Sequence, residues 1–193
     1  MNLLLLGPQG SGKGTQAKRI ADGWQIPHVS TGDMFRALDG STDTGRHVKA
    51  LMERGELVPD ELTIRMIEDR LSQDDAVDGF VLDGFPRNLA QAEALDAMLS
   101  AIGRGLDAIL FFDPPEEVAL ERMRGRGEEE GRSDDTPEAM RRRLELYHQQ
   151  TVPVVEHYRA TGKLVPLHAS RSVDEVADEI QRALDLFDNG DAA

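Results

Sequence analysis

Two hydrophobic patterns alternate along the chain. Short unbroken apolar runs predict buried β-strands, whereas stretches with an apolar residue every three or four positions predict amphipathic helices. The predicted strands are residues 2–6, a short strand at Val29, 79–83, 106–112 and 163–168. The predicted helices are residues 12–23, 30–38, 44–54, 60–73, 89–100, 116–124, 137–160 and 173–187. Pro153 should kink the longest of them, because proline lacks the backbone N–H that a helix needs.

Alternation of strands with helices predicts an α/β fold, with a doubly wound, parallel, five-stranded sheet and helices on both faces. Two stretches depart from the alternation. Residues 30–58 are helical where a simple crossover would suffice, and residues 125–136 form a charged, glycine-rich loop. Both are candidate insertions that cover a substrate. Residues 188–193 are expected to be a disordered tail.

Composition narrows the classes of protein that the chain can represent. The 193 residues carry a net charge of −14 and include no cysteine, which excludes disulfides, thiolate zinc sites and a cysteine nucleophile. A cytoplasmic location is expected, since no secretory signal is visible and the longest apolar run is too short to span a membrane. The acidic balance argues against nucleic acid as a partner, because nucleic-acid binding requires a basic face.

The basic residues are biased toward arginine. Of the 22 lysines and arginines, only Lys13, Lys18, Lys49 and Lys163 are lysine. Arginine offers a bidentate fork for phosphate, although genomic base composition would produce the same bias. The excess acid is interpreted as a solvated surface, with adaptation to high salt as the alternative. Because the overall field repels anions, any phosphate site must depend on locally clustered cations.

A glycine-rich segment between the first strand and the first helix predicts a phosphate site. Residues 7–15 read GPQGSGKGT, in the strand–loop–helix context of a P-loop. The glycines allow backbone N–H groups to surround phosphate oxygens, and Lys13 can reach the β- and γ-phosphates. Gly14 stands where the general motif has a Mg²⁺-binding hydroxyl, and Thr15 follows one position later. We therefore expect magnesium to be held mainly by nucleotide phosphates and water. Asp83 is a candidate anchor for such a water, or a turn-forming residue before Gly84.

Four segments in order carry a resemblance to a known family. They are residues 7–15, residues 30–36 (STGDMFR), residues 82–87 (LDGFPR) and residues 131–135 (GRSDD). Together they resemble the adenylate kinases, within the nucleoside monophosphate kinases, from Asn2 to about Phe187. The resemblance implies Mg²⁺-dependent transfer of a phosphoryl group from ATP to AMP, which gives two ADP.

The resemblance also implies roles for individual residues. The ATP-binding residues would be Gly10, Ser11, Gly12, Lys13, Gly14, Thr15, Arg122, Arg126 and Arg171. The AMP-binding residues would be Thr31, Arg36, Glu56, Leu57, Val58, Gly84, Phe85, Pro86, Arg87, Gln91, Arg132 and Arg143. The catalytic residues would be Lys13, Arg87, Arg126, Arg132 and Arg143. No residue is expected to bind a metal directly.

The implied organisation is one domain over residues 1–193. Its core would comprise 1–29, 59–125 and 137–187, with an AMP-binding insertion at 30–58 and a lid at 126–136. The lid resembles the short form of the family, without structural zinc, and Glu128, Glu129 and Glu130 at its tip are expected to face solvent. Both mobile parts should close over the nucleotides, because water would otherwise hydrolyse ATP. The family expectation is a monomer.

The chemistry agrees with a site made of cations. The acceptor oxygen of AMP is largely ionised at neutral pH, since its second pKa is about 6, so no general base is needed. Positioning and charge stabilisation then account for catalysis. The five histidines are accordingly expected to be packing or surface residues. Of the adjacent arginines 141–143, we expect only Arg143 to face the site. Gln91 and Arg87, four residues apart, could share one helical face.

Two other functions are compatible with parts of this pattern. A UMP/CMP-type kinase shares the P-loop and the Gly-Phe-Pro-Arg segment, although Thr31, Gln91 and the short lid fit AMP better. A nucleotide-dependent switch or binding module would also contain a P-loop. It would not need the lid arginines, and the sequence has no Asn-Lys-x-Asp segment for reading guanine.

Overall fold

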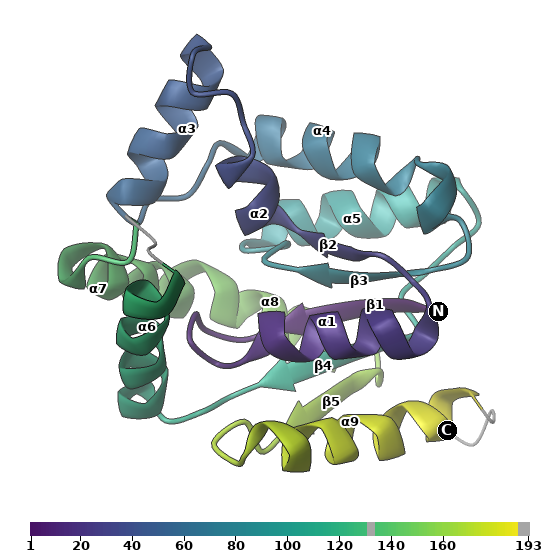
Figure 1. Ribbon diagram of the computed structural model, residues 1–193. Coiled ribbons are helices and arrows are strands. Elements are labelled where there is room, and N and C mark those ends of the chain that lie inside the picture. The colour runs from purple at the N-terminus through teal and green to yellow at the C-terminus, as the bar shows by residue number, and fades with distance from the viewer. Residues whose placement is uncertain (131–133, 189–193) are drawn as a thin grey trace.

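A parallel sheet forms the centre of the molecule (Figure 1). The computed structural model describes residues 1–130 and 134–188, apart from the side chains of residues 126–130 and 188. Within these residues, five parallel strands follow the order β2-β3-β1-β4-β5. Their bounds are β1 Asn2–Leu6, β2 His28–Ser30, β3 Phe80–Asp83, β4 Ala108–Phe112 and β5 Leu164–Leu167. This arrangement confirms the predicted α/β fold.

Helices cover both faces of the sheet, because successive side chains of a strand point to opposite sides. Leu3 and Leu5 of β1 pack with α1 (Lys13–Trp24) and α9 (Val173–Asp188) on one face. Leu4 and Leu6 face the opposite helices, which are α4 (Asp60–Leu71), α5 (Leu89–Ala101) and α8 (Val152–Arg159). Each of the four leucines is at most 2% exposed, and burial of such a side chain contributes about 1.5–3 kcal/mol.

The predicted helical insertion projects from one end of the sheet. After β2 the chain forms α2 (Thr31–Arg36) and α3 (Asp43–Glu53), seen at the upper left of Figure 1. The hydroxyl of Ser30 caps α2 by accepting a hydrogen bond from the Asp33 N–H. A small separate hydrophobic core stabilises the insertion; its buried members are Phe35, Val48 and Val58.

The helix after β4 is longer than the sequence analysis predicted. α6 extends over Glu116–Glu130, so the predicted loop does not begin at Gly125. Two glycines lower the helix propensity here, but the arginines and glutamates around them favour a helix strongly enough to continue it. None of the helices in the described part of the chain combines the length and the apolar character that crossing a membrane requires.

The predicted helix at 137–160 is divided by a π-helical turn. α7 covers Pro137–Leu146, the π-turn Tyr147–Thr151, and α8 follows. In the turn the Val152 N–H donates to the Tyr147 carbonyl, five residues back. Pro153 has no N–H to donate, and the helix takes a π-helical hydrogen-bond pattern in the turn just before the proline, near the position where the sequence predicts a kink. A 3₁₀ helix at Asp74–Ala76 completes the described elements, and residues 189–193 of the predicted tail lie outside them.

Candidate active site

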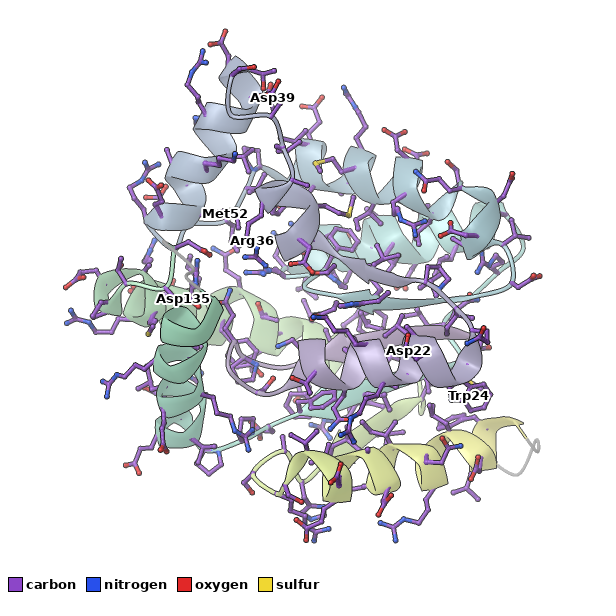
Figure 2. All side chains as sticks on the ribbon, viewed as in Figure 1. Asp22, Trp24, Arg36, Asp39, Met52 and Asp135 are labelled. Atoms are coloured by element: carbon purple, nitrogen blue, oxygen red, sulfur yellow. The ribbon has the colours of Figure 1, made fainter. Side chains whose placement is uncertain are left out.

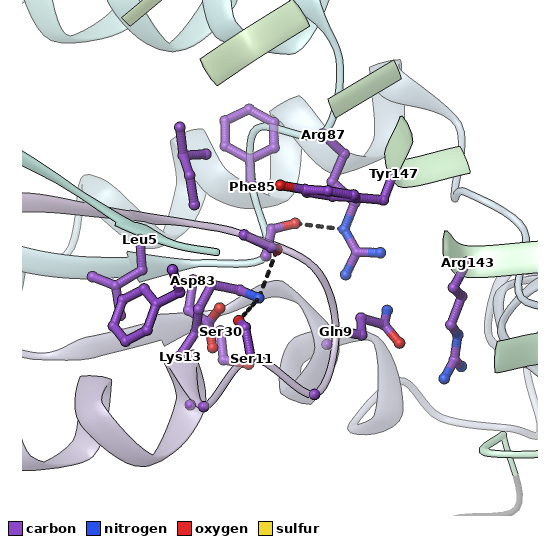
Figure 3. Close-up of a pocket in the computed structure, with 18 of the residues that line it drawn as sticks. Leu5, Gln9, Ser11, Lys13, Ser30, Asp83, Phe85, Arg87, Arg143 and Tyr147 are labelled. Carbon is purple, nitrogen blue, oxygen red and sulfur yellow. Dashed lines mark hydrogen bonds between the residues drawn. The ribbon is translucent and has the colours of Figure 1, made fainter. Parts of the chain in front are cut away.

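Most of the residues singled out by the sequence line a cleft at the carboxyl ends of the strands, where open parallel sheets bind ligands. The cleft has a volume of about 870 Å³. Its walls come from the P-loop, the helical insertion, the turn after β3, and α7 (Figure 3). These segments are far apart in the chain, and parallel pairing of β1 with β3 and β4 brings their ends together.

The P-loop wraps tightly between β1 and α1. Gly10 has φ +77°, and a Cβ added there would lie 2.1 Å from the Ala119 carbonyl oxygen, so a larger residue cannot fit. The ammonium of Lys13 lies over the loop. It donates to the Gly7 and Pro8 carbonyls at 2.7 and 2.6 Å, and to the Ser11 hydroxyl at 3.2 Å (Figure 3). A positive charge is thereby placed above a concave backbone, which is the geometry that holds phosphate.

Asp83 supplies the carboxylate of the site. Burial acts to raise the pKa of Asp83, but the His28 ring at 3.6 Å and the charges of Lys13 and Arg87 outweigh it and lower the pKa below the ordinary value. The side chain therefore stays ionised beside the P-loop. An ionised oxygen here fits Mg²⁺, which prefers oxygen ligands and keeps part of its water shell. Thr15 also lines the cleft.

His28 is expected to be a packing or surface residue, and the structure places its largely buried ring at the edge of the site. The ring lines the cleft on β2, next to the carboxylate of Asp83 on the adjacent strand β3. The sequence could not reveal this neighbour, because the register of β2 against β3 sets it.

Three arginines from different elements meet across the cleft from Lys13. Arg36 ends α2, Arg87 follows β3, and Arg143 lies on α7. Figure 2 shows Arg36 on the side of the insertion that faces α6 and α7. Burial, followed by the positive charges of Arg143 and Arg36, lowers the pKa of Arg87 to about 10, although Asp83 acts in the opposite direction. Mutual repulsion of these partly buried cations marks a place that an anion would stabilise.

Two acidic residues before α7 hold Arg143 in place. Its guanidinium donates to Asp134 at 2.6 Å and to Asp135 at 2.5 Å, and also to the Met52 carbonyl at 3.1 Å. Asp134 lies 3.6 Å from Arg36 as well, so one carboxylate bridges α7 and the insertion. The Arg143 side chain is only 8% exposed, which makes these bonds strong constraints on its direction. Arg141 and Arg142 are exposed, as expected.

The wall opposite the P-loop is built around a buried amide. Gln91 is 2% exposed, and its Oε1 accepts the backbone N–H of Arg87 at 2.8 Å. Arg87 precedes α5, which begins at Leu89, so the predicted sharing of one helical face is wrong. The guanidinium of Arg87 is held by the Gly84 carbonyl, to which Nε donates at 2.8 Å.

Most of the predicted nucleotide-binding residues line this one cleft. They are Gly10, Ser11, Gly12, Lys13, Gly14, Thr15, Arg36, Glu56, Leu57, Val58, Gly84, Phe85, Pro86, Arg87, Gln91, Arg122, Arg143 and Arg171. Thr31 is buried behind the wall, where a Cβ at Gly84 would lie 2.6 Å from its hydroxyl. Arg132 lies outside the described residues, as does the side chain of Arg126.

Arg122 and Arg171 lie at the α9 end of the cleft. Arg122 is oriented by the Ala169 carbonyl, to which it donates at 2.7 Å. The segment from Arg171 to Val173 continues the wall toward α9. These residues line the side of the P-loop away from the insertion, which separates them from Arg36 and Gln91.

Other cleft residues were missed by sequence reasoning. Phe35, Met52, Asp134 and Tyr147 all line the cleft. Phe35 and Met52 follow the helical spacing of ordinary core residues, so their pattern carries no separate signal. Asp134 did stand in one of the family segments, and its charge next to an arginine-rich helix was the available sign.

Comparison with known proteins identifies the family to which the chain is similar. The family model described as "Adenylate kinase" matches residues 5–163. Proteins named adenylate kinase are similar over 185 residues, which is 95% of this chain and 99% of theirs. Identity is 50% for one from Xanthomonas campestris pv. campestris (strain 8004), 49% for one from Xanthomonas oryzae pv. oryzae (strain MAFF 311018) and 48% for one from Stenotrophomonas maltophilia (strain K279a).

Proposed function

Since the chain belongs to the adenylate kinase family and is a phosphotransferase that catalyses ATP + AMP = 2 ADP, we propose that its cleft holds the two nucleotides end to end. One observation carries the proposal. Lys13 on the P-loop faces Arg36, Arg87 and Arg143 within a single cavity, although the molecule has a net charge of −14. These four cations are partly buried and converge from separate segments of the chain, which creates a locally positive site suited to polyanions in an otherwise acidic protein.

ATP occupies the side formed by the P-loop and α9. Gly10 to Thr15 surround its phosphates, and the N-terminus of α1 adds its dipole. Lys13 exchanges its carbonyl contacts for the β- and γ-phosphates. Arg122 and Arg126 hold the outer phosphates, and Arg171 lies near the base.

AMP occupies the side formed by the insertion and the turn after β3. Arg36 and Arg87 grip its phosphate, while Gln91 and residues 56–58 contact its base. Gly84, Phe85 and Pro86 form the floor, and Thr31 supports Gly84 from behind. Arg132 and Arg143 reach the transferred phosphoryl group from the side of the lid, and Asp134 with Asp135 orient Arg143.

Catalysis consists of positioning and charge stabilisation. The AMP phosphate attacks as an oxyanion, so no side chain has to remove a proton. The arginines hold the two polyanions in line and stabilise the charge that shifts across the transferred phosphoryl group. The insertion at 30–58 and the lid at 126–136 close to exclude water.

Adenylate kinases use Mg²⁺ with their nucleotides, and here Asp83 would hold its water shell beside the P-loop. Bound Mg²⁺ would neutralise charge on the phosphates of ATP. The partners of the enzyme are the small nucleotides ATP, AMP and ADP rather than nucleic acid. It acts as a cytoplasmic monomer without structural zinc. A cysteine-free chain suits that reducing compartment.

Replacement of Arg87 tests the proposal. Arg87→Ala should lower ADP formation from ATP and AMP by at least about a hundredfold, because one donor to the transferring charge is lost. The matched control is Arg142→Ala, since Arg142 lies one residue before Arg143, is exposed, and pairs with Glu145 at 2.7 Å. Thermal unfolding of both variants checks that the fold persists. Unchanged activity in a folded Arg87→Ala protein would refute the role of Arg87 in binding the AMP phosphate.

The acceptor class is tested with AMP, CMP, UMP and GMP in one coupled assay. The named relatives favour AMP over the UMP/CMP alternative. Wild-type enzyme should therefore use AMP at least about tenfold better, as kcat/KM, than any other acceptor. Comparable rates with CMP or UMP would assign the enzyme to the alternative class.

A further inference from the structure

The amide of Gln91 is held on both sides by groups that permit only one orientation. Its Oε1 accepts the Arg87 backbone N–H at 2.8 Å, and its Nε2 donates to Oδ1 of Asp60 at 2.7 Å. If the amide turned over, its NH₂ group would face the Arg87 N–H and its oxygen would face a carboxylate. Both new contacts are repulsive, because an N–H can only donate and a carboxylate can only accept.

Asp60 is fixed in turn by the start of the neighbouring helix. Asn88 Nδ2 donates to both of its carboxylate oxygens, at 2.9 and 3.2 Å, while Asn88 Oδ1 accepts the Gln91 N–H at 2.9 Å. Asn88 is the N-cap of α5, and Asp60 is the first residue of α4. The three side chains therefore form a closed network that ties two helix N-termini to one orientation of the amide.

The remaining hydrogen-bonding groups of the Gln91 amide can recognise a nucleotide base. A glutamine amide has two N–H donors and two acceptor lone pairs, and the two bonds above use one of each. One donor and one acceptor are left, in a fixed order, on a residue that lines the cleft. A 6-aminopurine presents an amino donor next to a ring-nitrogen acceptor, whereas a 6-oxopurine presents an oxygen acceptor next to a ring N–H. Each order of the amide fits only one of them.

We propose that Asp60 is a positioning residue that fixes the Gln91 amide and thereby makes the acceptor site select 6-aminopurine over 6-oxopurine nucleotides. The proposal rests on the proposed function, in which Gln91 contacts the base of AMP. Asp60 itself touches no nucleotide, and its effect passes through the orientation of Gln91.

The experiment compares AMP with IMP, which differs in the 6-substituent and in protonation of the adjacent ring nitrogen. Asp60→Asn replaces one acceptor oxygen by an NH₂ group, which must face either Gln91 or Asn88. The ratio of kcat/KM for AMP to that for IMP should fall by roughly tenfold or more. KM for ATP should stay within about twofold, because the ATP side lies beyond the P-loop. Asp60→Ala, which removes both acceptor oxygens, should act in the same direction.

Glu61→Gln is the matched control, because it removes the same charge from the same helical turn at an exposed position, where Glu61 pairs with Arg65 at 3.3 Å. It should leave the AMP/IMP ratio unchanged. A loss of stability alone would lower both rates together and would not move the ratio. Thermal unfolding of each variant reports such a loss separately.

Gln91→Ala distinguishes the positioning role of Asp60 from the contact between Gln91 and the base. If Gln91→Ala lowers the AMP/IMP ratio while the folded Asp60 variants keep the wild-type ratio, the positioning role of Asp60 is refuted and the proposed function stands. If Gln91→Ala changes neither the ratio nor KM for AMP, the placement of Gln91 against the base is refuted, and the role of Asp60 with it.

Discussion

At the residue scale, Asp83 joins stability to function. Its lowered pKa means that the folded protein favours the ionised form. Such a group contributes stability above the ordinary pKa of 3.8, and this contribution is lost as the pH falls through the lower pKa of the folded state. The same negative charge is the one that the magnesium water shell would require.

Asp83→Asn should therefore be less stable than wild type at pH 7, and the difference should close as the pH falls below 3.8. Urea unfolding at pH 7, 5 and 3 measures it, with the exposed Asp78→Asn as control. Phosphoryl transfer at pH 7 should also fall by about 10–100-fold. Parallel loss of stability with acid in wild type and Asp83→Asn would contradict the stated role of the carboxylate.

Residues differ in how visible their roles are in the sequence. Lys13 stands in a glycine-rich motif whose spacing implies phosphate binding, whereas Arg36 and Arg87 stand in segments to which the family resemblance assigns nucleotide binding. All three line the cleft. Phe35 and Met52 line it too, but their spacing is that of helix residues in any core. A side chain that packs against a ligand and one that packs against protein have the same hydrophobic pattern, so only the packing separates them.

At the element scale, the insertion contacts α7 through Gly55, just after α3. Gly55 has φ +70°, and an added Cβ would lie 2.4 Å from the Ala139 carbonyl oxygen. This contact sits beside the bond from Arg143 to the Met52 carbonyl. The spacing between α3 and α7 is therefore set where an arginine of the site is anchored.

Gly55→Ala tests that spacing. The left-handed backbone alone costs about 1–2 kcal/mol for alanine, and the clash should add about 1–3 kcal/mol. KM for AMP should rise, because Arg143 loses its bond to the Met52 carbonyl, one of the three that orient it. The control is Gly103→Ala, which has φ +68° with no atom within 4 Å of an added Cβ and so carries the backbone cost alone. Equal loss of unfolding free energy in the two variants would rule out the proposed contact.

Some boundaries of the helices do not follow from the local sequence pattern. Strand and helix positions agreed closely with the apolar pattern, because each element must bury its own face against the sheet. The carboxyl-terminal end of α6 and the π-turn before Pro153 did not. An individual glycine or proline signals a break, but whether the helix continues depends on the summed propensity and packing of its neighbours.

At the scale of the whole molecule, the local charge of the cleft is opposite in sign to the net charge of the protein. A net charge of −14 repels nucleotides at a distance, while Lys13 and several arginines attract them inside one cleft. Occupation of both nucleotide sites at once should therefore stabilise the protein strongly.

A compound that joins two adenosines through five phosphates should span both sites. At a thousand times its Kd it should add about 4 kcal/mol to the free energy of unfolding, as differential scanning calorimetry would measure. It should bind far more tightly than ATP alone, and Arg87→Ala should remove most of that advantage. Affinity no greater than that of ATP would mean that the two sites do not lie end to end.

The sequence alone determined the class of fold and the P-loop, and the arginines of the site were predicted from its resemblance to a family. The hydrophobic period and the spacing of glycines are local properties, so they can be recognised from the amino-acid sequence itself. Tertiary structure decided that His28 adjoins Asp83, that Asp134 bridges Arg143 and Arg36, and that Asp60 holds Gln91. Each of these contacts joins residues from different segments. Strand register and helix packing set their distances, and neither can be read from local spacing.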